Sequence, residues 1–287
     1  MAAYRKKKKD GGDMKQILTD MHTHSEHSHD SVCPIEEMCL AQLERGTDIF
    51  AVTDHCNVRA FQQKDVYTPI IKAWETVQEL NKAYQGRIRI LSGVEIGEGF
   101  FWVPEELKKL KALCPYDVII GSVHCVRFGE LTQAYSRIDF SEFPLEQVYA
   151  YLDAYFDDML DMIDGMDFDV LAHLTCPLRY ITGKYGIQVD LSPFQEKIRL
   201  ILEKIIQRNI ALEVNTSTYS TMGEFMPNAD ILRMYYDMGG RLVTVGSDAH
   251  VAANAAKNIP EAVEMLKSIG FREIFYYQER KPHGIPI

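Results

Sequence analysis

Histidines and carboxylates recur at a few places along this chain of 287 residues. His22 and His24 are separated by one residue, and Asp248 and His250 repeat that spacing near the other end. Because side chains alternate along an extended strand, residues two apart point the same way. Two adjacent imidazoles repel each other when protonated, but as neutral nitrogen donors they can bind one divalent cation. The spacing therefore predicts a metal site.

Further candidate ligands stand where other short apolar segments end. They are His55, Glu95, His124 and His173. A single histidine at a strand end is usually an ordinary structural residue, whereas a series of such ends carrying imidazoles or carboxylates favours a metal centre. A Ser-His-Asp triad built on Ser122 and His124 is the alternative, but no GxSxG motif accompanies it.

Apolar, β-branched segments alternate with helical patterns along most of the chain. We expect strands at 17–19, 48–53, 88–96, 117–123, 170–172, 210–214 and 242–245. We expect helices at 34–45, 68–84, 104–113, 145–163, 192–207, 228–237 and 259–269. Seven such alternations predict an α/β fold, a TIM-like (β/α)7 barrel, with an open doubly wound sheet as the alternative. Active sites of such barrels lie at the carboxyl ends of the strands, where the candidate ligands stand.

Composition limits the kind of protein. The chain has 31 basic and 41 acidic residues and a net charge of −10, which argues against binding to duplex nucleic acid. Residues 1–14 include four successive lysines and predict a flexible basic extension, followed by one domain over 15–287. We find no signal peptide and no apolar run of the roughly 18–20 residues that a membrane span needs, so we expect a cytoplasmic protein. Without a CxxC pair, we expect its six cysteines to be reduced.

The order of these motifs resembles the PHP (polymerase and histidinol phosphatase) superfamily. The matching segments are 20–31, 53–55, 93–95, 121–124, 171–173 and 246–250. The likeness extends from about residue 17 to the end of the chain. It implies that the barrel is distorted and that it holds two or three divalent metal ions, which are zinc, iron or manganese in this family.

Carried over by position, the resemblance implies three sets of metal ligands. The first set is His22, His24, Glu95 and Asp248. The second shares Glu95 and adds His124 and His173, and the third is Asp30, His55 and His250. Glu95 would then bridge two metals. His29, next to Asp30, is the alternative ligand in the third set.

The segments 212–216 and 280–282 resemble the stand-alone histidinol-phosphate phosphatase branch of this superfamily. That likeness implies hydrolysis of L-histidinol phosphate to L-histidinol and phosphate in histidine biosynthesis, by a metal-bridging hydroxide. It implies catalytic roles for Glu95, Asp248 and His250.

Charged residues near the expected barrel mouth are candidates for contacts with the substrate. Arg179 and Arg127 follow two of the histidine motifs, and guanidinium groups match phosphate oxygens, so we predict a phosphate clamp there. Lys184 is a weaker candidate for this role. Glu98 and Glu224 could contact a cationic substrate end.

Three other functions stay open from the sequence alone. A PHP-type phosphatase acting on nucleotides or another small ester has the same metal ligands. An amidohydrolase-type metal hydrolase also begins with an HxH motif, but it usually has a bridging lysine where this chain has His124. A non-catalytic PHP module would have lost ligands, and here every expected position is filled. The sequence leaves the oligomeric state open.

Overall fold

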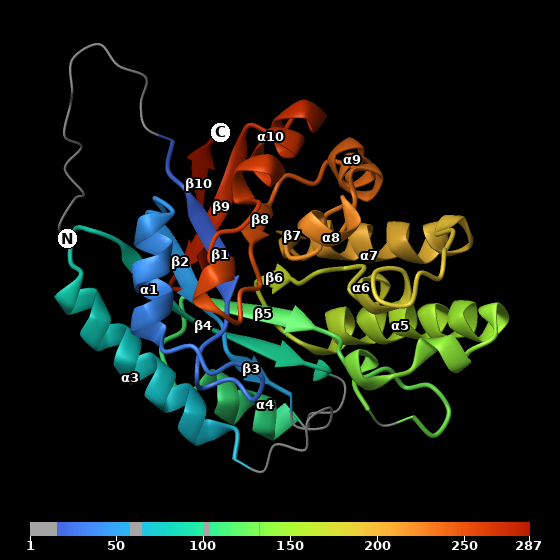
Figure 1. Cartoon of the computed structure of the whole chain (residues 1–287), viewed down its shortest axis with the longest axis horizontal. Helices are drawn as coiled ribbons and strands as arrows, with labels where there is room; N and C mark the ends of the chain where they lie inside the picture. Colours follow the sequence, from blue (N-terminus) through green and yellow to red (C-terminus); the bar gives the residue numbers. More distant parts are fainter. Residues whose placement is uncertain (1–15, 58–64, 100–103, 132) are drawn as a thin grey trace.

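A barrel of parallel strands forms the centre of the protein. The computed structural model describes residues 16–57, 65–99, 104–131 and 133–287, so the predicted extension 1–14 lies outside the described residues. The barrel strands are β1 (Thr19–Thr23), β2 (Ile49–Val52), β4 (Arg89–Gly97), β5 (Val118–Ser122), β6 (Val170–Leu171), β7 (Ala211–Asn215) and β8 (Val243–Gly246). They are hydrogen-bonded in that order, and helices surround them (Figure 1).

The helices lie where the sequence predicts them, within a few residues. They are α1 (Ile35–Glu44), α3 (Tyr67–Ala83), α4 (Pro104–Lys111), α5 (Leu145–Gly165), α7 (Gln195–Gln207), α9 (Ala229–Asp237) and α10 (Ile259–Ile269). Two short helices, α6 (Pro177–Ile181) and α8 (Tyr219–Met222), lie in segments without a predicted helix. In the described part of the chain, no helix is both long and apolar enough to cross a membrane.

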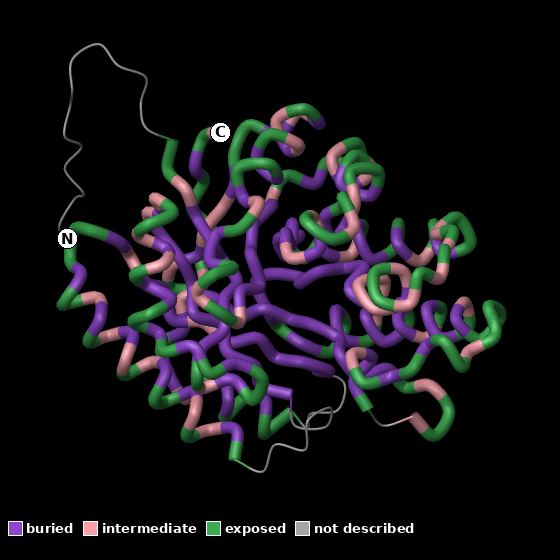
Figure 2. The backbone as a smooth tube through the Cα atoms, viewed as in Figure 1, coloured by how far each residue is buried: buried purple, intermediate pink, exposed green. Residues whose placement is uncertain are grey.

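The core lies between the barrel and the inner faces of these helices. The strands are buried along almost their whole length, while each helix exposes one side (Figure 2). The pattern follows from amphipathic helices that cover a sheet of mostly apolar strands. All six cysteines are free and buried, as expected for reduced thiols.

The barrel closes through its first and last strands, at their carboxyl ends. The Asp248 N–H donates to the His22 carbonyl at 2.8 Å, and the His24 N–H donates to the Ala249 carbonyl at 2.9 Å. A two-residue strand, β3 (His55–Cys56), pairs with β4 beyond the end of β2, so β4 has two partners on that side. The predicted distorted (β/α)7 barrel is confirmed, and the open doubly wound alternative is wrong.

The first strand differs from its prediction. We expected residues 17–19, whereas β1 runs over Thr19–Thr23 and so includes His22. The apolar pattern does not reveal this strand because its residues are mostly polar, although all of them are buried. Asp20, for example, accepts hydrogen bonds from the Ser247 backbone N–H at 2.8 Å and from the Gln42 side chain at 2.6 Å.

A carboxyl-terminal hairpin, β9 (Glu273–Gln278) and β10 (Lys281–Pro286), was not predicted. Its turn contacts the starts of two barrel strands. The Arg280 N–H donates to the Asp117 carbonyl at 2.9 Å, and its guanidinium binds the Asp169 carboxylate at 3.0 Å. The hairpin therefore lies at the amino-terminal end of the barrel, opposite the end that carries the histidines.

Candidate metal centre

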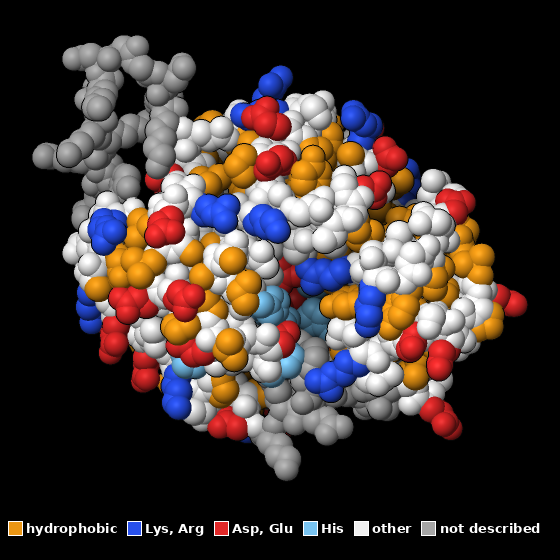
Figure 3. Space-filling model, viewed as in Figure 1, with side chains coloured by type: hydrophobic (Ala, Val, Ile, Leu, Met, Phe, Trp, Pro, Cys, Tyr) orange, Lys and Arg blue, Asp and Glu red, His pale blue; other side chains and the backbone are white. Residues whose placement is uncertain are grey.

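All nine residues predicted as metal ligands meet at the carboxyl end of the barrel. They are His22, His24, Asp30, His55, Glu95, His124, His173, Asp248 and His250. The imidazoles lie at the bottom of a hollow whose rim carries lysine or arginine side chains (Figure 3). Because parallel strands place their carboxyl ends at one edge, ligands from distant parts of the chain become neighbours.

Glu95 lies at the middle of this cluster and is completely buried. Its Oε1 is 3.3 Å from Nε2 of His124 and 3.1 Å from Nε2 of His173. Its Oε2 is 3.3 Å from Nε2 of His22 and 3.6 Å from Nε2 of His24. Oε2 also lies 2.7 Å from Nδ1 of His55, so the two oxygens face different sets of histidines, which is the arrangement that a bridging carboxylate needs.

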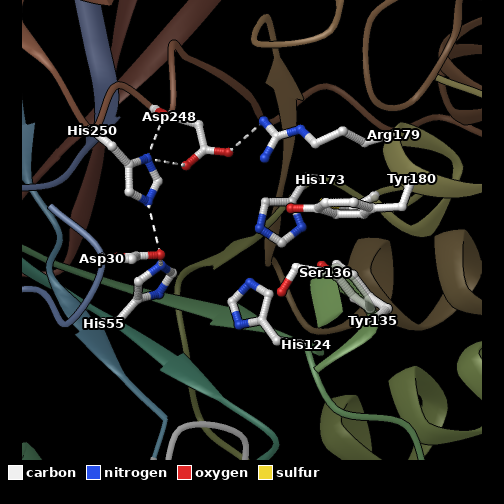
Figure 4. Close-up of a pocket in the computed structure, with 11 residues that line it drawn as sticks. Asp30, His55, His124, Tyr135, Ser136, His173, Arg179, Tyr180, Asp248 and His250 are labelled. Atoms are coloured by element: carbon white, nitrogen blue, oxygen red, sulfur yellow. Dashed lines mark hydrogen bonds and ion pairs between the residues drawn. The ribbon is translucent and has the colours of Figure 1, made fainter. Parts of the chain in front are cut away.

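A second group of ligands surrounds Asp30 at the edge of the hollow (Figure 4). Its Oδ2 is 3.4 Å from Nε2 of His55 and 3.3 Å from Nε2 of His250. His29 is adjacent, with Nε2 at 3.6 Å from the same oxygen. Since the Asp30 oxygen contacts both imidazoles, the geometry favours Asp30 over His29 as the ligand in this group.

Charge is strongly concentrated around Glu95. Burial by itself raises the pKa of Glu95, but the neighbouring imidazoles, with His55 the strongest, hold it well below its usual range. Burial lowers the pKa of His22, yet the carboxylates of Glu213 and Glu95 outweigh burial and raise it well above the ordinary value. The same opposition, with Glu95 the main partner, raises the pKa of His55 to about 10.

Two other imidazoles in the cluster, those of His24 and His124, stay neutral. Burial, together with His250 and His55, holds the pKa of His24 well below its usual value. Burial also lowers the pKa of His124 to about 4, although Glu95 opposes the shift. Neutral imidazoles next to ionised carboxylates are the donors that zinc and similar divalent cations prefer.

The geometry of the donor atoms also fits metal ions. Three sets of donors have atoms that all lie within 4.8 Å of one another, namely His22/His24/Asp248, His55/Glu95/His124 and His24/His55/His250. Among the described residues, the buried Nε2 of His24 makes no aligned hydrogen bond, although Oδ1 of Asp248 lies 3.2 Å away. A buried polar atom without a partner is costly unless something else binds it, and a cation is the natural partner for a ring nitrogen.

Glu213 supports two of these histidines, and the sequence analysis did not identify it as a site residue. Its Oε1 is 2.6 Å from Nδ1 of His22, and its Oε2 accepts the His173 backbone N–H at 2.7 Å. A carboxylate on Nδ1 keeps the proton there, which leaves Nε2 free to bind a metal. Gly246 makes room for this pair, since a Cβ there would lie 2.5 Å from Oε1 of Glu213. Its position could have identified it from the sequence, because Glu213 lies at the end of a predicted strand, as the other candidate ligands do.

Glu98 has a different role from the predicted contact with substrate. It is 1% exposed, and its Oε1 accepts the backbone N–H groups of His124 at 2.6 Å and Cys125 at 2.8 Å. Burial raises its pKa to about 7. Glu98 therefore anchors the loop that carries His124 and does not line the hollow. Glu224 is exposed and lines neither of the cavities beside the metal centre.

The backbone is unusual at three residues of this face. Glu98, His173 and Asp248 have φ values of 49°, 21° and 54°. Positive φ is uncommon for residues other than glycine and persists only where the surroundings hold it. Two of these residues, His173 and Asp248, are candidate ligands, so this backbone conformation sets the direction of their side chains.

A cavity of about 260 Å³ opens directly above the imidazoles. Its other wall includes Tyr135, Ser136, Arg179 and Tyr180, on the right in Figure 4, and Cys176 also lines the cavity. Arg179 Nη2 is 3.0 Å from Oδ2 of Asp248 and also binds the Ser217 hydroxyl. Except for Arg179, none of these residues was predicted from the sequence, because isolated aromatic and hydroxyl residues in loops form no recognisable motif.

Arg127 does not reach this cavity, contrary to the predicted clamp. Its Nε is 2.6 Å from Oδ1 of Asp158 in α5, and its Nη2 binds Asp161 in the same helix. Its backbone N–H also donates to Asp158. These two aspartates hold the guanidinium against α5 and away from the residues that line the cavity.

A parallel barrel with clustered imidazoles and carboxylates at its carboxyl end defines a class of metal-binding α/β barrels. Within that class, the chain belongs to the PHP family, because the family model described as PHP domain matches residues 20–217.

Relatives and a solved structure agree with this membership. A probable histidinol-phosphatase of Thermotoga maritima is 28% identical over 88% of this chain and 93% of its own length. A probable histidinol-phosphatase of Clostridium acetobutylicum is 27% identical over 91% of this chain and 97% of its own length. The fold is similar to that of histidinol phosphate phosphatase from Lactococcus lactis, solved with zinc, L-histidinol and phosphate, with a TM-score of 0.77 and 21% identity. That comparison covers 93% of this chain and 98% of the other.

We predict that Glu213→Gln weakens metal binding. The amide removes the negative charge on Nδ1 of His22 while keeping the shape of the side chain. Loss of such a partner typically lowers metal affinity about 10- to 100-fold. Equilibrium dialysis with zinc measures this, and Glu224→Gln, an exposed glutamate in the following loop, is the matched control. Equal affinity in Glu213→Gln and the native protein would contradict the role of Glu213.

Metal binding should also release protons. At pH 7.5 the metal-free protein keeps His55 protonated, since its pKa is about 10, and His22 and His173 likewise, since the pKa of each is raised well above normal. A metal binds only the neutral ring, so lowering the pH weakens binding and raising it strengthens binding. We expect release of about two to three protons per chain, measured by titration calorimetry in buffers of different ionisation enthalpy. His283→Gln, which removes a ring stacked on Tyr276, should give the same count. Binding without proton release would exclude these histidines as ligands.

Proposed function

We propose that the protein is a metal-dependent phosphomonoesterase that hydrolyses L-histidinol phosphate to L-histidinol and phosphate. The observation that best supports the proposal is the complete burial of Glu95, whose two oxygens face different sets of imidazoles. The Thermotoga and Clostridium relatives are named as probable histidinol-phosphatases, and the Lactococcus structure contains L-histidinol and phosphate, which supports the choice of substrate. A role in histidine biosynthesis in the cytoplasm belongs to the same proposal.

We assign the ligands to two or three divalent metals. His22, His24, Glu95 and Asp248 would hold the first, and Glu95, His124 and His173 the second. Asp30, His55 and His250 would hold the third. Nitrogen and oxygen donors in this mixture suit zinc, iron or manganese, and zinc is the ion named for the Lactococcus structure.

The arrangement suits hydrolysis of a phosphate ester. Divalent metals in this cluster would lower the pKa of a water and neutralise phosphoryl oxygens, so that no covalent phospho-enzyme is needed. The residues of the chain would position the reactants. The carboxylates of Glu95 and Asp248 would hold the metal ions at the bottom of the cavity, with His250 beside them. Arg179 presents a guanidinium at the cavity wall. Burial acts to lower the pKa of Arg179, but Asp248 outweighs burial and raises it, so the group stays cationic.

The catalytic proposal is stronger than a non-catalytic one because all nine candidate ligands are present and lie close together. It is also stronger than the amidohydrolase alternative, because His124 approaches Glu95 in the place where a bridging lysine would be required. Among phosphatases, other small esters are the remaining competitors.

The substrate is tested directly with a panel of phosphate esters. We expect L-histidinol phosphate to give the highest kcat/KM, compared with nucleoside monophosphates and p-nitrophenyl phosphate, in enzyme loaded with zinc, manganese or iron. Removal of metal by chelation should abolish turnover, and restored metal should restore it. If a nucleotide exceeds L-histidinol phosphate by about tenfold or more, the biosynthetic assignment is wrong and a general phosphatase remains.

Arg179→Ala should lower kcat/KM for every phosphate monoester. Loss of one charged hydrogen bond costs about 1.5–3 kcal/mol, which is roughly 10- to 150-fold. Metal content should not change, because Arg179 is not a ligand. Arg127→Ala distinguishes between the two predicted clamp residues. We expect it to lower kcat/KM by less than about threefold, because Arg127 binds α5. A larger loss in Arg127→Ala than in Arg179→Ala would reverse this assignment.

A further inference from the structure

A second cavity of about 460 Å³ adjoins the one above the metal centre. The two share four lining residues, Arg179, Tyr180, Asp248 and His250, all labelled in Figure 4. The second cavity, here called the side groove, lies over the carboxyl ends of β6, β7 and β8. A molecule bound at the metal centre can therefore extend into the side groove without leaving the surface.

The side groove is cationic. Lys184, after α6, and Lys257, after β8, line it together with Arg179. Both lysines are exposed, and within the described ranges neither forms an ion pair with a carboxylate. Asp248 is the one carboxylate among the described residues that line the side groove, and Arg179 already binds it at 3.0 Å.

Neutral polar groups complete the lining. Ser217, Thr218 and Thr221 line it from the segment after β7, but their hydroxyls already donate to the Asn215 side chain and to the carbonyls of Glu224 and Thr218. Asn254 contributes an amide, and lysine ammonium groups beside an amide donor can bind phosphate oxygens. A cationic substrate end would be repelled from the same lining.

The base of the side groove is held in place by hydrogen bonds between its two sides. The buried Thr216 donates its hydroxyl to the Lys257 carbonyl at 2.6 Å, and the Asn258 amide donates to the Thr216 carbonyl at 3.2 Å. The Ser220 hydroxyl donates to the Asn258 side chain at 3.1 Å. These contacts tie the loop after β8 to the loop after β7, so the backbone that carries Lys257 is fixed before any ligand binds.

We infer that the side groove is a second anion subsite, which binds a phosphate next to the phosphate at the metal centre. The inference rests on the proposed phosphatase function only in taking the metal centre as the first phosphate site. The second phosphate is either the far group of a doubly phosphorylated ligand or inorganic phosphate after hydrolysis. For L-histidinol phosphate, the side groove turns the ammonium away from Lys184 and Lys257.

The test measures binding to the metal-loaded protein, so it does not depend on turnover. Calorimetry compares α,ω-alkane bisphosphonates of two to six carbons with alkylphosphonates of equal length. We expect the best bisphosphonate to bind at least about tenfold more tightly than its matched monophosphonate. In the double variant Lys184→Gln/Lys257→Gln this advantage should fall below about threefold, while Lys267→Gln, a lysine of α10 paired with Glu264, should retain it.

Calorimetric titration with inorganic phosphate distinguishes the two sources of the second phosphate, a doubly phosphorylated ligand and free phosphate. Two phosphates bound per native chain, and one in the double variant, would show that the side groove accepts free phosphate. One in both proteins, with the bisphosphonate advantage present, would show that it accepts only a tethered phosphate.

Equal affinity for bisphosphonates and monophosphonates, or an advantage that survives in the double variant, would overturn the subsite. Failure of the proposed function has a different signature. In that case no monoester in the panel is hydrolysed, whatever the bisphosphonates do.

Discussion

The buried carboxylate of Glu95 is the constraint on which the rest of the structure depends. An ionised carboxylate without water is tolerated only when opposite charges or hydrogen-bond donors surround it. Here imidazoles from β1, β3 and the loops after β5 and β6 supply those partners, and none of them is near Glu95 in sequence. The barrel must therefore close so that the carboxyl ends of its first, middle and later strands all lie around Glu95. A cluster with this composition is favourable around cations and would be poor core packing otherwise.

A second layer of carboxylates fixes the ligands from behind. Glu213 holds His22 and the backbone of His173, and Glu98 holds the backbone of His124. Asp20 ties the loop after β8 to β1 through Ser247 and the Ala256 N–H. In each case a buried acid accepts backbone N–H groups from a neighbouring loop, and each such bond limits where an imidazole can move. The positive φ angles at Glu98, His173 and Asp248 are found on the same face.

The surroundings of the metal centre are asymmetric, and this asymmetry bears on the substrate. On one side, Asp30 lines the cavity, while Asp248 lines both cavities and is paired with Arg179. On the other side, Arg179, Lys184 and Lys257 carry positive charge into the side groove. A phosphate ester at the centre therefore meets different potentials in different directions. The orientation of its far end is set by that difference as much as by shape.

The sequence by itself determined the barrel and the identity of the residues at its carboxyl end. Both follow from local features, namely the alternation of strand and helix patterns and the position of polar residues at strand ends. It missed β1 beyond Thr19 and the hairpin β9–β10, because buried polar strands and terminal hairpins carry no such alternation. The tertiary structure alone decided that Glu98 and Glu213 anchor loops and ligands, that Arg179 faces the cavity and that Arg127 binds α5. Each of these outcomes depends on a partner 26 to 191 residues away, which no local pattern specifies.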